Sequence, residues 1–285
     1  MSTSTGRTLR DIWLQEQELG GDFFKGKTIE QLRDIAGDGQ LRDGNETSKQ
    51  LRQFFHAINS THIEEYAQEC LDKTFPHSGL VLQDLVNEIG RRLDFAVTDG
   101  CYRGSPTRIG YDGIWKAADN YSFVIEVKTT DAYNMNLDTQ ADYRKRLVED
   151  GTLDKEKSSI LVVVGRKDTG GLEAQTRGSR HASDVRLISV EALVKLMHIK
   201  QSLDNTSTVD RIQSILKPLE YTRVDDLVDL IFTTSEDLQE EEEEEEEPPE
   251  ERDTPTPQTR QQPVATARFR EQCAQRVSSH LGTEL

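Results

Sequence analysis

Three residues of the sequence have the types and the spacing of a hydrolytic centre that uses a metal ion. Asp112 stands fourteen residues before Glu126, and Lys128 follows Glu126 by two. Side chains two residues apart on a β-strand point to the same face, so a strand over 121–128 places Glu126 and Lys128 together. A strand over 109–115, joined to it by a polar turn, brings Asp112 back beside them.

Hydrolysis of a phosphodiester is the chemistry that this set suits. Two carboxylates hold Mg²⁺, which keeps several waters and takes a phosphate oxygen as a further ligand. The ion stabilises charge that develops on phosphorus and lowers the pKa of a bound water. Lys128 would orient or activate that water, and the carbonyl of Val127 would complete the ligands of the ion. We expect Mg²⁺ as the cofactor, with Mn²⁺ as its substitute.

The apolar periodicity predicts an α/β domain around these two strands. Apolar residues at helical spacing indicate a helix over 80–93. Short β-branched and aromatic runs indicate the strands. The expected order is a helix (80–93), three strands (94–97, 109–115, 121–128), a helix (138–149), a strand (159–164), a loop or short helix, a strand (185–189) and a helix (190–199). This order provides helical cover for both faces of a mixed central sheet.

The motif and the order of elements together resemble the PD-(D/E)xK nuclease superfamily, which has the restriction-endonuclease-like fold. Asp112, Glu126 and Lys128 match the acidic and basic positions of that motif, although Tyr111 stands where the motif has proline. The resemblance covers about residues 80–200. It implies that these three residues are catalytic, that DNA is the substrate, and that the protein acts in restriction or defence.

The resemblance also implies a fourth catalytic residue. Many members of the superfamily carry a glutamate on the first core helix, close to the metal. Glu88 lies on the corresponding helix of this sequence and is the candidate for that position. A single site of this kind cuts one strand, so cleavage of both strands requires a homodimer or two successive visits.

Polar residues around the motif are candidates for contact with the DNA backbone. Arginines commonly hold phosphates, but each candidate also fits an ordinary solvated surface or an ion pair. The candidates are Arg103 and Arg108 before the site, Arg144 on the helix after it, and Gln175, Arg177 and Arg180 after the apolar strand.

The net charge of −17 comes mainly from one segment near the end of the sequence. Residues 235–253 hold thirteen acidic residues against one arginine. Such a segment cannot bury a core, and we expect it to be disordered, either as a solubilising linker or as a polyanion that competes with DNA. The predicted parts are a helical domain (1–75), the nuclease-like domain (76–205), a helical extension (206–234), an acidic disordered linker (235–266) and a short amphipathic helix (267–285) that docks on a partner or opens a further domain.

The remaining composition favours a cytoplasmic protein that does not enter a membrane. No apolar run approaches the ~20 residues of a membrane helix, and Cys70, Cys101 and Cys273 form no metal-binding pattern. Two other functional classes stay open. One is a catalytically inactive nuclease fold that binds DNA or a protein, and the other is an interaction protein in which the terminal segments matter most.

Overall fold

The structure is a computed structural model that describes residues 7–104, 109–129, 135–165, 170–203 and 205–218, and residue 228. All of them belong to one compact unit, Met1–Glu242. The predicted acidic linker (235–266) and terminal helix (267–285) lie outside the described residues, as does most of 219–234.

A mixed five-stranded sheet forms the centre of the described chain, which confirms the predicted α/β class. The strands are β1 (Ala96–Asp99), β2 (Gly113–Lys116), β3 (Ser122–Lys128), β4 (Ser158–Val164) and β5 (Val185–Ser189), and they lie side by side in that order. β1, β2 and β3 pair antiparallel, whereas β3, β4 and β5 pair parallel. The predicted turn between β2 and β3 is present, closed by a 2.8 Å hydrogen bond from the Ala117 amide to the Tyr121 carbonyl.

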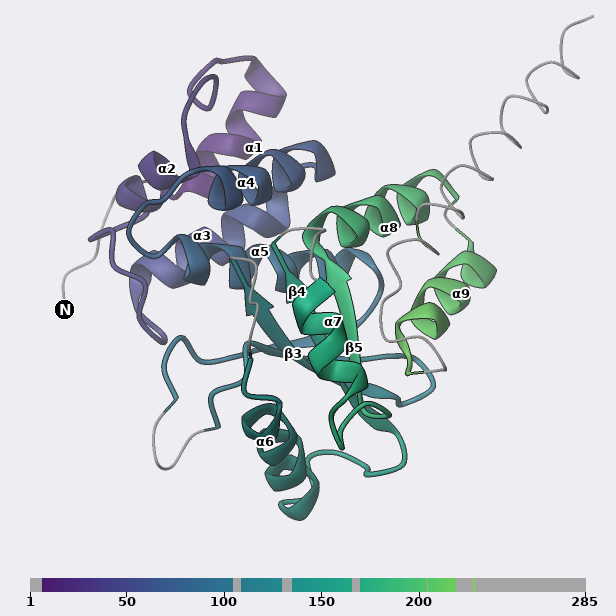
Figure 1. Cartoon of the computed structure of the whole chain (residues 1–285). Helices are drawn as coiled ribbons and strands as arrows, with labels where there is room; N and C mark the ends of the chain where they lie inside the picture. Colours follow the sequence, from purple (N-terminus) through teal and green to yellow (C-terminus); the bar gives the residue numbers. More distant parts are fainter. Residues whose placement is uncertain are drawn as a thin grey trace, which may run out of the picture. The chain divides into compact units, whose positions relative to one another are not determined.

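Helices cover both faces of this sheet (Figure 1). On one face, α5 (Ser78–Arg92) and α8 (Val190–Ser202) pack against strand residues such as Trp115 and Phe123. On the other face, α6 (Leu137–Glu149) and α7 (Gly170–Arg177) pack against Val124 and Val162. Every residue of β4 is buried, as expected for an interior parallel strand with helices on both sides. A short helix, α9 (Thr206–Leu216), follows α8.

In the described chain, four helices precede α5. They are α1 (Leu9–Leu19), α2 (Ile29–Ile35), α3 (Glu46–Ala57) and α4 (Ser60–Asp72). Each begins at a side chain that accepts a hydrogen bond from the first turn, namely Thr8, Thr28, Asn45 and Asn59. Their apolar residues belong to the same continuous core as α5, α8 and one sheet face. Residues on both sides of the predicted boundary at residue 75 therefore share one core.

The described helices include none that is long and apolar enough to cross a lipid bilayer.

Candidate active site

Asp112, Glu126 and Lys128 converge at the end of β3. Asp112 immediately precedes β2, whose first residue pairs with Ile125, so it lies level with the last residues of β3. The backbone amide of Val127 donates a 2.7 Å hydrogen bond to Oδ2 of Asp112. The ammonium group of Lys128 contacts the carboxylate of Glu126. The convergence that strand alternation predicts is therefore present.

The backbone of Asp112 is held by β3, by α5 and by Gly100, which follows β1. Its amide donates to the carbonyl of Ile125 at 3.0 Å. Its carbonyl accepts from the Gly100 amide at 3.0 Å, from Asn87 Nδ2 at 2.9 Å and from Gln83 Nε2 at 3.2 Å. Because Gln83 and Asn87 are both buried on α5, that helix fixes where the Asp112 side chain emerges.

Val127 occupies the position between the acid and the lysine, and its side chain packs against the core on the α5 face. In a strand, the amide and the carbonyl of one residue point to the same side. Since the Val127 amide points to Asp112, its carbonyl points to that side as well. The carbonyl oxygen is thus directed to the side of β3 on which Asp112 lies.

Burial makes the ionised form of Asp112 unfavourable. Removal from water and the adjacent Glu126 carboxylate raise the pKa of Asp112 to about 7, against the lowering effects of the Val127 amide and Lys128. The Glu126 side chain is only 7% exposed, whereas that of Lys128 is 36% exposed. The acids therefore lie below the surface, and the lysine extends from them toward solvent.

The structure places Glu88 away from this group. Its carboxylate contacts Arg92 at 3.3 Å, His56 at 3.5 Å and Arg91 at 3.6 Å. The acid of α5 that lies near enough to raise the pKa of Asp112 is instead Asp84, one turn earlier. Asp84 is fully buried. Its carboxylate forms an ion pair with Arg52 and accepts a hydrogen bond from the hydroxyl of Tyr102.

Sequence reasoning missed Asp84 because helical periodicity marks only the apolar stripe. Both Asp84 and Glu88 lie outside that stripe, at the same relative helical position, yet both are buried. The helices α3 and α4 pack on α5 in addition to the sheet, so its polar faces are covered too. Gln83 and Asn87 are four residues apart and so lie on one face of this helix. This spacing of two amide side chains is the sequence feature that could have indicated a buried polar face.

The donor set fits a hard divalent cation with oxygen ligands. Two adjacent carboxylates and a carbonyl on the side of Asp112 are ligands of the kind that Mg²⁺ takes when water and a phosphate fill its other positions. Among the described residues, no group of three or more His, Cys, Asp or Glu side chains is arranged to hold a metal ion. A cation here would rest on Asp112, Glu126 and the Val127 carbonyl.

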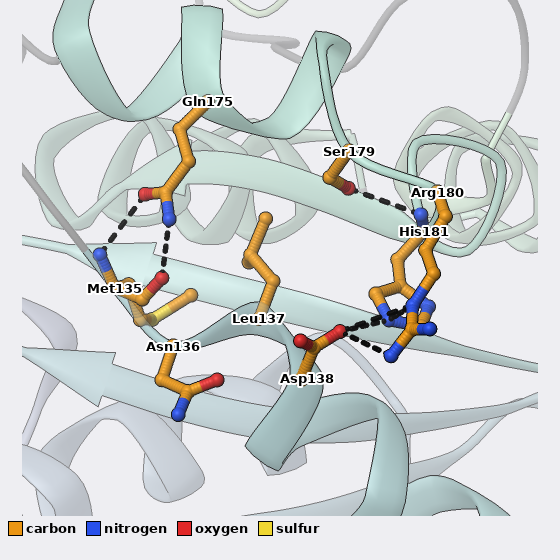
Figure 2. Close-up of a pocket in the computed structure, with 8 residues that line it drawn as sticks. All are labelled: Met135, Asn136, Leu137, Asp138, Gln175, Ser179, Arg180 and His181. Atoms are coloured by element: carbon orange, nitrogen blue, oxygen red, sulfur yellow. Dashed lines mark hydrogen bonds and ion pairs between the residues drawn. The ribbon is translucent and has the colours of Figure 1, made fainter.

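Two of the three residues predicted to contact DNA after β4, Gln175 and Arg180, line a cavity of about 750 Å³ between α6 and α7 (Figure 2). The side-chain amide of Gln175 is already hydrogen-bonded within the protein, to both the amide and the carbonyl of Met135. Arg180 forms a 2.8 Å ion pair with Asp138, which also bonds His181 at 2.8 Å. Arg177, one turn after Glu173, contacts that carboxylate.

The other predicted DNA contacts have different surroundings. Arg144 is mostly buried and bonds Ser158 Oγ at 3.0 Å and Asp184 at 3.5 Å, so it joins α6 to the start of β4 and to the chain before β5. Arg103 is exposed on the connection before β2. Arg108 lies outside the described residues.

Comparison of the chain with models of known protein families gives no match, and comparison with curated proteins gives none either.

Proposed function

We propose that this protein is a metal-dependent nuclease of the PD-(D/E)xK type, with a restriction-endonuclease-like core, that hydrolyses DNA phosphodiesters. The observation that carries the proposal is the convergence of Asp112 with Glu126 and Lys128, joined by the hydrogen bond from Val127 to Asp112. A carboxyl group whose pKa is raised by burial and by a neighbouring carboxylate, as that of Asp112 is, is typical of functional sites.

Each residue has a distinct role in the proposed reaction. Asp112, Glu126 and the Val127 carbonyl would hold Mg²⁺, for which Mn²⁺ substitutes. The bound ion would supply positive charge next to the scissile phosphate. Lys128, which is more exposed than Glu126, would leave Glu126, offset charge on the phosphate and orient the attacking water.

One contact supports a second candidate, a nuclease fold that binds DNA or a partner protein without cutting. Lys128 contacts Glu126, and a lysine that stayed there would compete with a cation for that carboxylate. The two candidates differ in whether a cation displaces the lysine.

Nicking of a supercoiled plasmid in Mg²⁺ or Mn²⁺, with EDTA as the control, separates the candidates when DNA binding is measured in parallel. The proposed nuclease nicks only with the metal. Binding without nicking would favour the inactive fold, and an absence of both would favour an interaction protein.

A further inference from the structure

Arg52 connects the N-terminal helices to the helix that supports the candidate site. Its side chain leaves α3 and places Nε 2.9 Å from Oδ1 of Asp84 on α5, and its guanidinium lies 3.7 Å from Asp99 on β1. The same group stacks over the ring of Tyr102, 5.0 Å from the ring centroid. The Tyr102 hydroxyl donates to the other oxygen of Asp84.

The Asp84 carboxylate therefore has a donor on each oxygen although its side chain is wholly inaccessible to water. A buried carboxylate that lost such a partner would be an uncompensated charge in a medium of low polarity. It would have to take up a proton or move, and it sits on the helix that fixes Asp112.

The neighbours of Asp84 show how such a movement would reach the site. Gln83 and Asn87, one residue before and three residues after it, hold the carbonyl of Asp112. Asn87 also accepts a 2.9 Å hydrogen bond from Trp115 Nε1. A shift of α5 by a fraction of an ångström would displace these donors from Asp112.

We propose that Arg52 is a positioning residue for the metal site: by pairing with Asp84, it fixes α5 and, through Gln83 and Asn87, the carboxylate of Asp112. The proposal rests on the proposed function, because it assigns Arg52 an effect on the cation that Asp112 would bind. It also makes residues 7–75 part of the catalytic unit and not a separable module.

Arg91 provides a matched control. It is an arginine of similar exposure, 28% against 26% for Arg52, and it pairs with the same Asp99 at 2.7 Å. Its ion pairs are with Asp99 and Glu88 and not with Asp84. Arg91→Gln therefore removes a partly buried charge from the same network and leaves the Asp84 contact intact.

The test measures Mn²⁺ binding by calorimetry and plasmid nicking at varied Mn²⁺, on the full chain. We expect Arg52→Gln to weaken Mn²⁺ binding by roughly 10- to 100-fold, as removal of the groups that orient metal ligands does. Arg91→Gln should bind like the wild type. Arg52→Lys keeps the positive charge but lacks the planar guanidinium, so its Mn²⁺ affinity should lie between those of the two glutamine variants.

Three results would count against the inference. Wild-type affinity for Mn²⁺ in a folded Arg52→Gln protein, judged by circular dichroism and thermal unfolding, would overturn it. If Arg52→Gln fails to fold, wild-type affinity in Arg52→Lys would do the same. A wild-type protein that neither binds Mn²⁺ nor nicks DNA would instead overturn the proposed function, and the inference with it.

Discussion

The Val127 amide donates a 2.7 Å hydrogen bond to Oδ2 of Asp112. A side-chain oxygen thus takes the place of a backbone partner at the point where the pairing of β2 with β3 ends. One consequence is that the carboxylate is anchored before any ligand arrives. Another is that the residue between Glu126 and Lys128 presents its carbonyl to the same side.

Gly113→Ala should damage the site through α5. A Cβ atom at Gly113 would lie 2.2 Å from Oδ1 of Asn87, so Asn87 must move and weaken its bonds to Asp112 and Trp115. We expect a loss of roughly 1–3 kcal/mol in the free energy of unfolding, measured with urea, and weaker Mg²⁺-dependent activity. Gly170→Ala is the control, because an added Cβ there would meet no described atom within 4 Å apart from its chain neighbours and its own helix backbone. Equal effects of the two substitutions would show that Asn87 is not displaced from Asp112.

Asp112→Asn should stabilise the metal-free fold at alkaline pH. The pKa of Asp112 is raised to about 7 in the folded protein from 3.8, so its contribution to stability is complete below about pH 4 and is lost as the pH rises through about 7. Asparagine carries no charge and still accepts from Val127. The substitution should therefore raise the free energy of unfolding at pH 8 and have little effect near pH 4.

The same variant should lose the stabilising effect of the metal. Added Mg²⁺ should raise the melting temperature of the wild type at pH 8, because a ligand that binds only the folded state stabilises it, and should leave Asp112→Asn unchanged. A wild type that is more stable than Asp112→Asn at pH 8 without metal would show that Asp112 is not crowded as described.

Asp138→Asn tests whether the cavity of Figure 2 faces DNA. Asp138 pairs with both Arg180 and His181, and Asp138→Asn removes the negative charge that neutralises the Arg180 guanidinium. If Arg180 then contacts a phosphate, DNA binding should tighten, and the slope of log affinity against log salt should steepen by about 1. Adding Arg180→Gln should reverse both changes. Unchanged affinity and slope would mean that the three side chains only join α6 to the segment after α7.

The sequence allowed the order of the elements and the convergence of three site residues to be predicted. Strand alternation alone places Glu126 and Lys128 on one face. A short hairpin then requires Asp112 to lie opposite the end of their strand. The helix α1 was not predicted, because only Leu9 and Trp13 of its eleven residues are buried. Its apolar signal is too sparse for periodicity to detect.

The residues around the site depended on tertiary contacts that no local pattern contains. Helical spacing makes Glu88 and Asp84 equivalent. Only the packing of α3 on α5 brings Arg52 into hydrogen-bond contact with Asp84. Gln175 looked like a surface residue of a polar stretch, yet it bonds the Met135 backbone forty residues away. Long-range partners of this kind become visible only when the chain is folded.

In the proposed function, Asp112, Glu126 and Lys128 form one catalytic centre. The decisive measurement is the initial rate of plasmid nicking at saturating Mg²⁺ for the wild type, Asp112→Ala, Lys128→Ala and a control, Lys116→Ala. Lys116 is an exposed lysine at the end of β2. We predict that the wild type and Lys116→Ala nick at similar rates. Lys128→Ala should be slower by roughly 10²-fold or more, as when one charge-stabilising group is lost, and Asp112→Ala should be similarly impaired. Nicking by both site variants at the wild-type rate would show that the centre lies elsewhere.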